Sequence, residues 1–136
     1  MTSRRKFLGG SVAATLGLVI PSRANAQTKA VNKGTKVCKK SAISVGGGKI
    51  FSTRKGPILV TQPKKGLFRA FSAMCTHEGC TIGPFGSSTN VVVGGVVSCG
   101  CHGAAFNPST GAVVRGPAQT ALGKYTVSTD KTYIYI

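Results

Sequence analysis

The sequence predicts an all-β domain, and three observations lead to that prediction. No segment after residue 26 has apolar residues at the 3.6-residue period of an amphipathic helix. The same part of the chain contains several short apolar runs of the β type, separated by turn residues. A hydrophobic content of 41% with 19 glycines suits a compact β-rich globule. The 136 residues are sufficient for one domain with a modest core.

The first 26 residues are predicted to be an export signal and not part of the fold. The paired Arg4 and Arg5 precede an apolar run at residues 7–20, and residues 24–26 (ANA) have the small-x-small pattern of a signal peptidase site. The string SRRKFL resembles a twin-arginine signal. The run is 14 residues long, whereas a membrane span needs about 20. We therefore expect cleavage after Ala26, with retention of the run as an anchor as the alternative.

The predicted elements follow in order along the mature chain. Residues 27–44 are polar and basic, and we expect them to form a flexible lead-in in which Cys38 is exposed. The structured domain is expected over residues 45–136. The sequences PKKG and Gly94-Gly95 each favour a hairpin turn between neighbouring runs. The short β-type runs lie at residues 57–62, 67–73, 90–99, 111–116, 123–129 and 131–136.

The charge balance limits the classes of function. The chain carries 18 Lys and Arg residues against two acidic residues, Glu78 and Asp130, and the loss of residues 1–26 would leave a formal charge of +12. Two acidic residues, one of them inside a cysteine-rich run, argue against a two-carboxylate glycosidase. The basic residues are scattered and lack an RNA-binding aromatic signature, so nucleic-acid binding is not expected. The positive charge instead favours encounters with acidic partners or anionic surfaces.

Two cysteine-rich runs concentrate the reactive side chains. CTHEGC at 75–80 and CGCHG at 99–103 contain both histidines of the chain and four of its five cysteines. Each run directly follows an apolar strand, so each would lie on a loop held by a sheet. The two runs are 18 residues apart with a predicted hairpin between them, which lets the two loops converge on one point.

Several metal centres are compatible with these residue types. A zinc site would use two cysteines and two histidines, and it would leave the additional cysteine of each run unexplained. An iron–sulfur cluster bound by cysteines alone would leave the histidines unused. A mononuclear iron site with a carboxylate would need the same two histidines. A cluster with two cysteines on one iron and two histidines on the other uses both residue types.

The two runs resemble the paired boxes of the Rieske [2Fe–2S] family. CTHEGC matches the family's Cys-Thr-His-x-Gly-Cys, CGCHG matches its Cys-x-Cys-His-Gly, and GPA at 116–118 matches its cluster-covering segment. The resemblance covers about residues 45–136, with the cluster-binding part at about 74–118. It implies a Rieske-type antiparallel β-sandwich with a small cluster-binding subdomain of two loops.

The resemblance also implies which residues bind the [2Fe–2S] cluster. Cys75 and Cys99 would bind one iron, and His77 and His102 the other. Histidine ligands are neutral, so they raise the reduction potential into the range of roughly −150 to +300 mV.

The remaining residues of the two boxes receive structural roles from the same resemblance. Cys80 and Cys101 would form the disulfide of the cytochrome bc-like branch of the family. As residues without side chains, Gly79, Gly100 and Gly103 are expected both to turn the chain and to leave room for backbone N–H groups to point at cluster sulfurs.

Two positions depart from the high-potential relatives. Those proteins carry a serine directly after His-Gly and a tyrosine two positions later, whose hydroxyls donate hydrogen bonds to the cluster. Here the two positions are Ala104 and Phe106, which cannot donate. We therefore expect an intermediate potential, which argues against quinol oxidation.

Together these observations predict an exported one-electron carrier without catalytic activity of its own. It would be a soluble shuttle, with the small subunit of an oxidase such as arsenite oxidase and a cytochrome bc-type subunit as the competing contexts. The expected partner is an acidic redox protein, either a cytochrome or the large subunit of an oxidoreductase. The expected location is the periplasm or the extracytoplasmic face of the membrane, with no membrane span after cleavage. The alternative from another class is a zinc-stabilised binding module with the same two cysteine and two histidine ligands.

Overall fold

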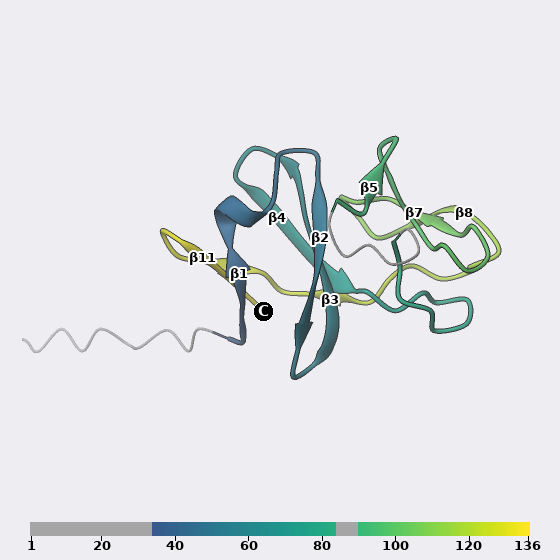
Figure 1. The fold of residues 1–136 in the computed structure, drawn as a ribbon, viewed down its shortest axis with the longest axis horizontal. Helices are drawn as coiled ribbons and strands as arrows, with labels where there is room; N and C mark the ends of the chain where they lie inside the picture. The colour runs from purple at the N-terminus through teal and green to yellow at the C-terminus, as the bar shows by residue number, and fades with distance from the viewer. Residues whose placement is uncertain (1–33, 84–89) are drawn as a thin grey trace, which may run out of the picture.

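The computed structural model describes residues 34–83 and 90–136, which are built almost entirely from antiparallel β-strands (Figure 1). Within these residues the one helical segment is a single 3₁₀ turn, η1 at Lys40–Ala42. The all-β prediction is therefore confirmed.

The strands form three small sheets, each with antiparallel pairing throughout. The first sheet has the order β1 (Lys36–Lys39), β11 (Tyr133–Tyr135) and β10 (Ser128–Thr129). The second has the order β2 (Gly48–Thr53), β3 (Gly56–Lys64), β4 (Leu67–Ser72) and β9 (Lys124–Tyr125). The third has the order β5 (Val92–Val93), β6 (Val96–Ser98), β7 (Ala105–Phe106) and β8 (Val113–Arg115).

The second sheet lies between two hydrophobic cores, and the apolar run of β3 explains why. Ile58 and Val60 pack into one core with Ile134 of the first sheet. Leu59, between them in sequence, packs into the other core with Phe106 of the third sheet. Because successive side chains of a strand point to opposite faces, a strand covered on both faces needs a continuous apolar run. The PILV sequence at 57–60 meets that need.

The molecule has two regions, the tip and the base. The tip is residues 74–118, which contain both cysteine-rich loops and the third sheet, on the right in Figure 1. The base is residues 34–73 and 119–136, which contain the other two sheets. The regions share the core around Leu59 and Phe106, and the buried Thr61 hydroxyl of the base donates to the Pro108 carbonyl of the tip at 2.6 Å. The tip therefore packs on the base as part of one folded unit.

Both predicted hairpins are present. The β3–β4 turn ends at Gly66, whose φ of +78° lies in the left-handed region that favours glycine. Gly94 and Gly95 join β5 to β6 with φ values of +59° and +78°. Two positive φ values in a two-residue hairpin turn are the geometry for which consecutive glycines are suited.

The prediction of a flexible lead-in over residues 27–44 is wrong for the part that forms β1. Cys38 pairs with Ile134 of β11 and is only 9% exposed, although lysines surround it in the sequence. The edge of the C-terminal strand β11 needs a partner for its backbone groups, and β1 supplies it. Burial raises the pKa of the Cys38 thiol to about 11, with the charge of Lys49 acting in the opposite direction. Cys38 is thus a core residue of the base and not an exposed thiol.

The predicted export signal at residues 1–26 lies outside the described residues. Within 34–83 and 90–136, no helix has the length and apolar character needed to cross a membrane.

Candidate metal centre

The first cysteine-rich loop follows β4 and is closed by two backbone hydrogen bonds. The Cys75 N–H donates to the Cys80 carbonyl at 2.6 Å, and the Gly79 N–H donates to the Cys75 carbonyl at 2.9 Å. Gly79 has a φ of +72°, a conformation that a residue with a side chain rarely adopts. The motif therefore requires glycine at this position for the turn.

The second loop follows β6 and repeats the same backbone pattern. The Cys99 N–H donates to the Ala104 carbonyl at 2.7 Å, and the Gly103 N–H donates to the Cys99 carbonyl at 3.0 Å. Gly103 has a φ of +78°. The Gly100 N–H donates to the Gly83 carbonyl at 3.2 Å, so all three glycine N–H groups of the boxes donate to backbone carbonyls. Of the two roles predicted for these glycines, the structure therefore shows the turn role at Gly79 and Gly103.

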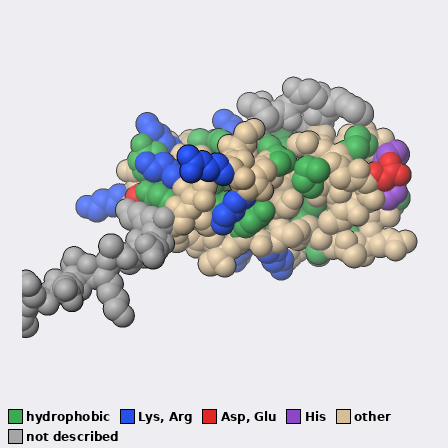
Figure 2. Space-filling view, turned by 90° about the horizontal axis from the view of Figure 1, so that it is seen from below, with side chains coloured by type: hydrophobic (Ala, Val, Ile, Leu, Met, Phe, Trp, Pro, Cys, Tyr) green, Lys and Arg blue, Asp and Glu red, His purple; other side chains and the backbone are tan. Residues whose placement is uncertain are grey.

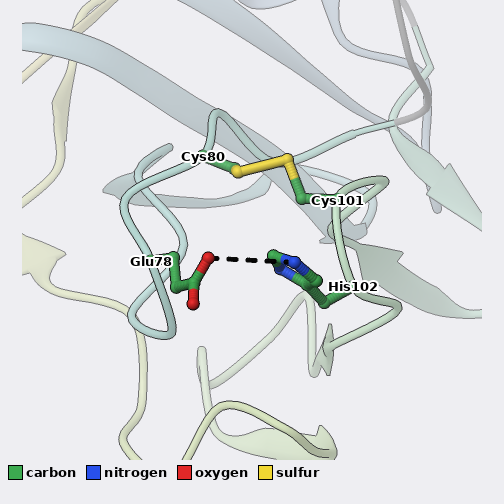
Figure 3. A network of polar contacts seen from close by, with 4 residues as sticks. All are labelled: Glu78, Cys80, Cys101 and His102. Atoms are coloured by element: carbon green, nitrogen blue, oxygen red, sulfur yellow. Dashed lines mark ion pairs between the residues drawn. A yellow bond between two sulfur atoms is a disulfide. The ribbon is translucent and has the colours of Figure 1, made fainter.

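Figure 3 shows two of the side-chain contacts that join the loops to each other. Cys80 and Cys101 form a disulfide with a Cα–Cα distance of 6.6 Å, as predicted. Below it in the view, a Glu78 carboxylate oxygen faces His102 Nε2 at 3.8 Å. The second contact is between exposed side chains and contributes little stability, so the covalent bond is the contact that fixes the two loops.

The two remaining cysteines of the tip lie side by side beneath the loops. Cys75 is 3% exposed and Cys99 is 2% exposed. Burial raises the pKa of the Cys75 thiol, and the adjacent Cys99 side chain, which hydrogen-bonds with it, raises that pKa further. The backbone N–H groups of His77 and Glu78 donate to the Cys75 sulfur and act in the opposite direction. This sulfur therefore has donors that would stabilise a thiolate bound to a metal.

The two histidines face each other at the exposed end of the tip. Their ring centroids are 5.0 Å apart with the ring planes nearly perpendicular, at 86°. The His102 side chain is 47% exposed. The histidines and Glu78 lie together at the far right of the molecule in Figure 2. The four predicted ligands thus form two pairs, with the thiols inside and the imidazoles at the surface.

A third segment contacts the first loop. The Thr76 hydroxyl donates to the Thr120 carbonyl at 2.6 Å. A hollow of about 430 Å³ beside these residues is lined by Thr76, His77, Pro117, Gln119 and Thr120. The GPA sequence at 116–118 is therefore next to the first box, where the family resemblance predicted a covering segment.

The donor set fits a two-iron cluster. Four potential ligands arranged as a buried thiol pair and an exposed imidazole pair suit a group with one iron inside and one at the surface. The donor atoms of His77, Glu78 and His102 also lie within 4.8 Å of one another, which keeps a mononuclear site geometrically open. The sulfur atoms of Cys80, Cys99 and Cys101 also lie within 4.8 Å of one another, so the disulfide is next to the Cys99 sulfur. The geometry alone therefore leaves more than one metal centre open.

Comparison with known proteins resolves this choice. Residues 33–126, more than half of the chain, match the family model of the Rieske [2Fe–2S] domain. The chain belongs to the Rieske family. Its cofactor is accordingly a [2Fe–2S] cluster, and the function of the domain is electron transfer. The match gives no support to the zinc alternative.

The relatives include subunits of larger complexes and small proteins of similar size. The cytochrome b6-f complex iron-sulfur subunit of Synechococcus elongatus is 38% identical over 80 residues, which are 57% of this chain and 41% of that protein. The corresponding subunit of Prochlorococcus marinus (strain MIT 9303) is 38% identical over 65 residues, 48% of this chain and 33% of that protein. The chain therefore spans less than half the length of these curated relatives.

A solved structure covers more of the fold. The plasma membrane Rieske protein of Synechocystis PCC 6803 superimposes with a TM-score of 0.61 and 29% identity, over 74% of this chain and 96% of that protein. The Rieske β-fold prediction is thereby confirmed.

Proposed function

We propose that Cys75 and Cys99 bind one iron of the cluster, that His77 and His102 bind the other, and that one electron leaves or enters through the exposed histidines. The observation that carries this proposal is the pairing itself, with buried thiols that are 2–3% exposed and an imidazole pair at the surface. When bound, the cluster supplies one-electron redox chemistry at a potential raised by its neutral ligands.

The protein residues then divide the work. The disulfide and the two turn hydrogen bonds of each loop hold the ligands in place. The N–H groups of His77 and Glu78 stabilise the Cys75 thiolate. His102 Nε2 faces the Glu78 carboxylate, so Nδ1 is the His102 nitrogen assigned to iron.

Isotope labelling tests the histidine ligands directly, because the chain has only two histidines. Protein grown with ¹⁵N-histidine is compared with unlabelled protein by pulsed electron paramagnetic resonance in the reduced state. We expect hyperfine couplings from two imidazole nitrogens, and both should change from ¹⁴N to ¹⁵N couplings in the labelled protein. Couplings that do not respond to the label would contradict the assignment.

We further propose that the protein is exported and passes electrons to a cytochrome or to the large subunit of an oxidoreductase. The twin-arginine-like segment and the disulfide support the periplasm or the extracytoplasmic face of the membrane as its location. The names of the relatives, subunits of the cytochrome b6-f complex, support a redox partner of this kind.

An acidic partner follows from the net charge, and it would be attracted over a long range. Stopped-flow oxidation of the reduced protein by an acidic c-type cytochrome tests this point. We expect a rate that falls steeply with ionic strength, whereas a rate independent of salt would exclude electrostatic attraction to such a partner.

A further inference from the structure

Within residues 34–136, the net positive charge belongs to the base. Residues 74–118 contain one basic residue, Arg115, and one acidic residue, Glu78. The base contains eleven basic residues and one acidic residue, Asp130, a formal charge of +10. Figure 2 shows the Lys and Arg side chains over the half of the molecule away from the histidines. The net charge of residues 34–136 therefore does not surround the histidines.

A groove in the base collects part of this charge. It has a volume of about 480 Å³ and is lined by residues 66–69 and by Tyr125, Thr126, Val127 and Thr129. Arg69 belongs to the lining and is exposed. The groove therefore combines a guanidinium with the ring of Tyr125.

Five lysines lie near this groove, two by their contacts with lining residues and three by their place in the sequence. Lys55 Nζ lies 5.8 Å from the Tyr125 ring centre, and Lys40 Nζ lies 6.0 Å from the Phe68 ring centre. Lys64 and Lys65 directly precede the lining residue Gly66. Lys131 follows the lining residue Thr129 by two positions. The groove and these five lysines are called the basic groove below.

The nearby acidic residue, Asp130, does not line the groove. The Asp130 carboxylate accepts hydrogen bonds from the Thr132 and Tyr133 N–H groups at 2.8 and 2.6 Å and from the Tyr135 hydroxyl at 2.7 Å. It is thus directed at the β10–β11 turn and at β11.

The second half of β4 and the start of the first cysteine-rich loop lie between the basic groove and the histidines. The groove lining contains the first three residues of this strand, Leu67 to Arg69, and the strand ends at Ser72, before the loop. The three strand residues outside the lining span about 10 Å. A redox partner seated on the groove would therefore be on the wrong side of the molecule to exchange an electron with the histidine pair.

We propose that the basic groove docks the protein on an anionic phospholipid membrane with the tip turned toward the water. Lysines and an arginine distributed around an open groove are complementary to a surface of many phosphate groups. The first described residues also enter the fold at the base, where the Thr35 N–H donates to the Ile136 carbonyl. The 33 residues before Gly34, which include the apolar run 7–20, are therefore attached to the same region as the proposed membrane contact.

Vesicle binding tests the proposal with residues 27–136, which contain every described strand. Co-sedimentation is measured with vesicles containing phosphatidylglycerol and with vesicles of phosphatidylcholine alone, at low and moderate ionic strength. We expect binding to the anionic vesicles that weakens with salt, and none to the neutral vesicles.

A matched pair of variants locates the contact. The double variant Lys64→Gln/Lys131→Gln removes two charges beside the groove, and it should bind anionic vesicles about 25-fold more weakly, about fivefold per lysine. Lys36→Gln/Lys49→Gln removes two charges from β1 and β2, the edge strands opposite the groove strands β10 and β9, and it should retain affinity within about threefold. Equal losses for the two variants would show that the groove has no special role, and the proposal would be wrong.

Hydrogen exchange tests the orientation and the competing occupant. With anionic vesicles we expect new protection at residues 64–69 and 128–132 and none at 75–80 and 99–103. Protection of the two cysteine-rich loops would contradict the orientation.

If the anionic vesicles bind no better than the neutral ones, while Lys64→Gln/Lys131→Gln weakens a complex with an acidic cytochrome, the groove is a protein-docking site and the membrane proposal fails. Neither outcome depends on the ligands of the cluster.

Discussion

The base and the tip are stabilised in different ways. The base contains the long strands, with nine residues in β3 and six each in β2 and β4, and its backbone groups are paired along these strands. The strands of the tip have two or three residues each. Its two ligand loops are closed by their own turn hydrogen bonds and joined by a disulfide. Short strands give little cooperative support, so the tip depends on local and covalent constraints.

The charges differ between the two regions in the same way. The base carries a formal charge of +10, whereas the tip has one charge of each sign. The base therefore carries the charge that attracts anionic partners over a long range, and the tip carries the predicted ligands of the cluster.

The largest difference between the two regions is expected when one buried cysteine of each is replaced by serine. Cys99→Ser in the tip should abolish the visible absorption of the cluster, because serine replaces a thiolate ligand. Cys38→Ser in the base, also at a buried cysteine, should retain the absorption and lose only some stability. Absorption spectra and iron content of the purified variants provide the measurement. A cluster that survives Cys99→Ser would remove this residue from the ligand set.

Removing the disulfide should destabilise the tip selectively. Cys80→Ser/Cys101→Ser opens a link between residues 21 positions apart, and the chain-entropy estimate for such a loop is about 3 kcal/mol. We expect a lower temperature of cluster loss and a lower reduction potential. Calorimetry and redox titration of the variant and of wild-type protein treated with reductant should agree. Unchanged stability and potential would show that the bond does not constrain the ligand loops.

The buried thiol of Cys38 should make the base sensitive to alkaline pH. Its pKa is about 11 in the folded protein against 9.0 for the unperturbed thiol, so above pH 9 the unfolded chain releases the proton first. The stability contributed by the neutral thiol is therefore complete below pH 9 and is lost by pH 11. Wild-type protein should lose about 2 kcal/mol more than Cys38→Ala across this window. Parallel stability curves for the two proteins would contradict the burial of the thiol.

The smallest effects are expected on the reduction potential of the [2Fe–2S] cluster. Ala104 and Phe106 are fully buried beside the second loop, and each replaces a hydrogen-bond donor of the high-potential relatives. Ala104→Ser and Phe106→Tyr should each raise the potential by roughly 40 mV, the equivalent of about 1 kcal/mol for one electron. Ala105→Ser serves as control, because in a strand this side chain points to the opposite face from its neighbours. An equal rise in the control would show that added polarity, and not a specific bond, sets the potential.

Local signals made much of the molecule predictable from the sequence. The two boxes lie within six and five consecutive residues, and the glycine turns and the apolar run of β3 are also local, so none of them required knowledge of distant contacts. The strand β1 was missed because Cys38 is surrounded by lysines and its partner, Ile134, lies almost 100 residues away. The two-residue strand β7 is too short to give a period.

The sequence picked out the side chains that the structure brings together at the candidate site, but not their environment. Nothing in the spacing of the boxes indicated that the N–H groups of His77 and Glu78, and not those of the glycines, would approach the Cys75 sulfur. The basic residues also appeared scattered along the sequence, although eleven of the twelve within residues 34–136 belong to the base. Both features depend on how the loops and hairpins are arranged in space.

A redox titration of residues 27–136, followed by low-temperature electron paramagnetic resonance, tests whether the tip, which has no net charge, holds a histidine-ligated [2Fe–2S] cluster. We predict a reduced-state signal whose average g value lies below that of an all-cysteine cluster, with an intermediate midpoint in the range of roughly −150 to +300 mV. A midpoint at the upper end would show that Ala104 and Phe106 do not lower the potential, and would make quinol oxidation a candidate again. The absence of any signal, together with one bound zinc, would contradict the account.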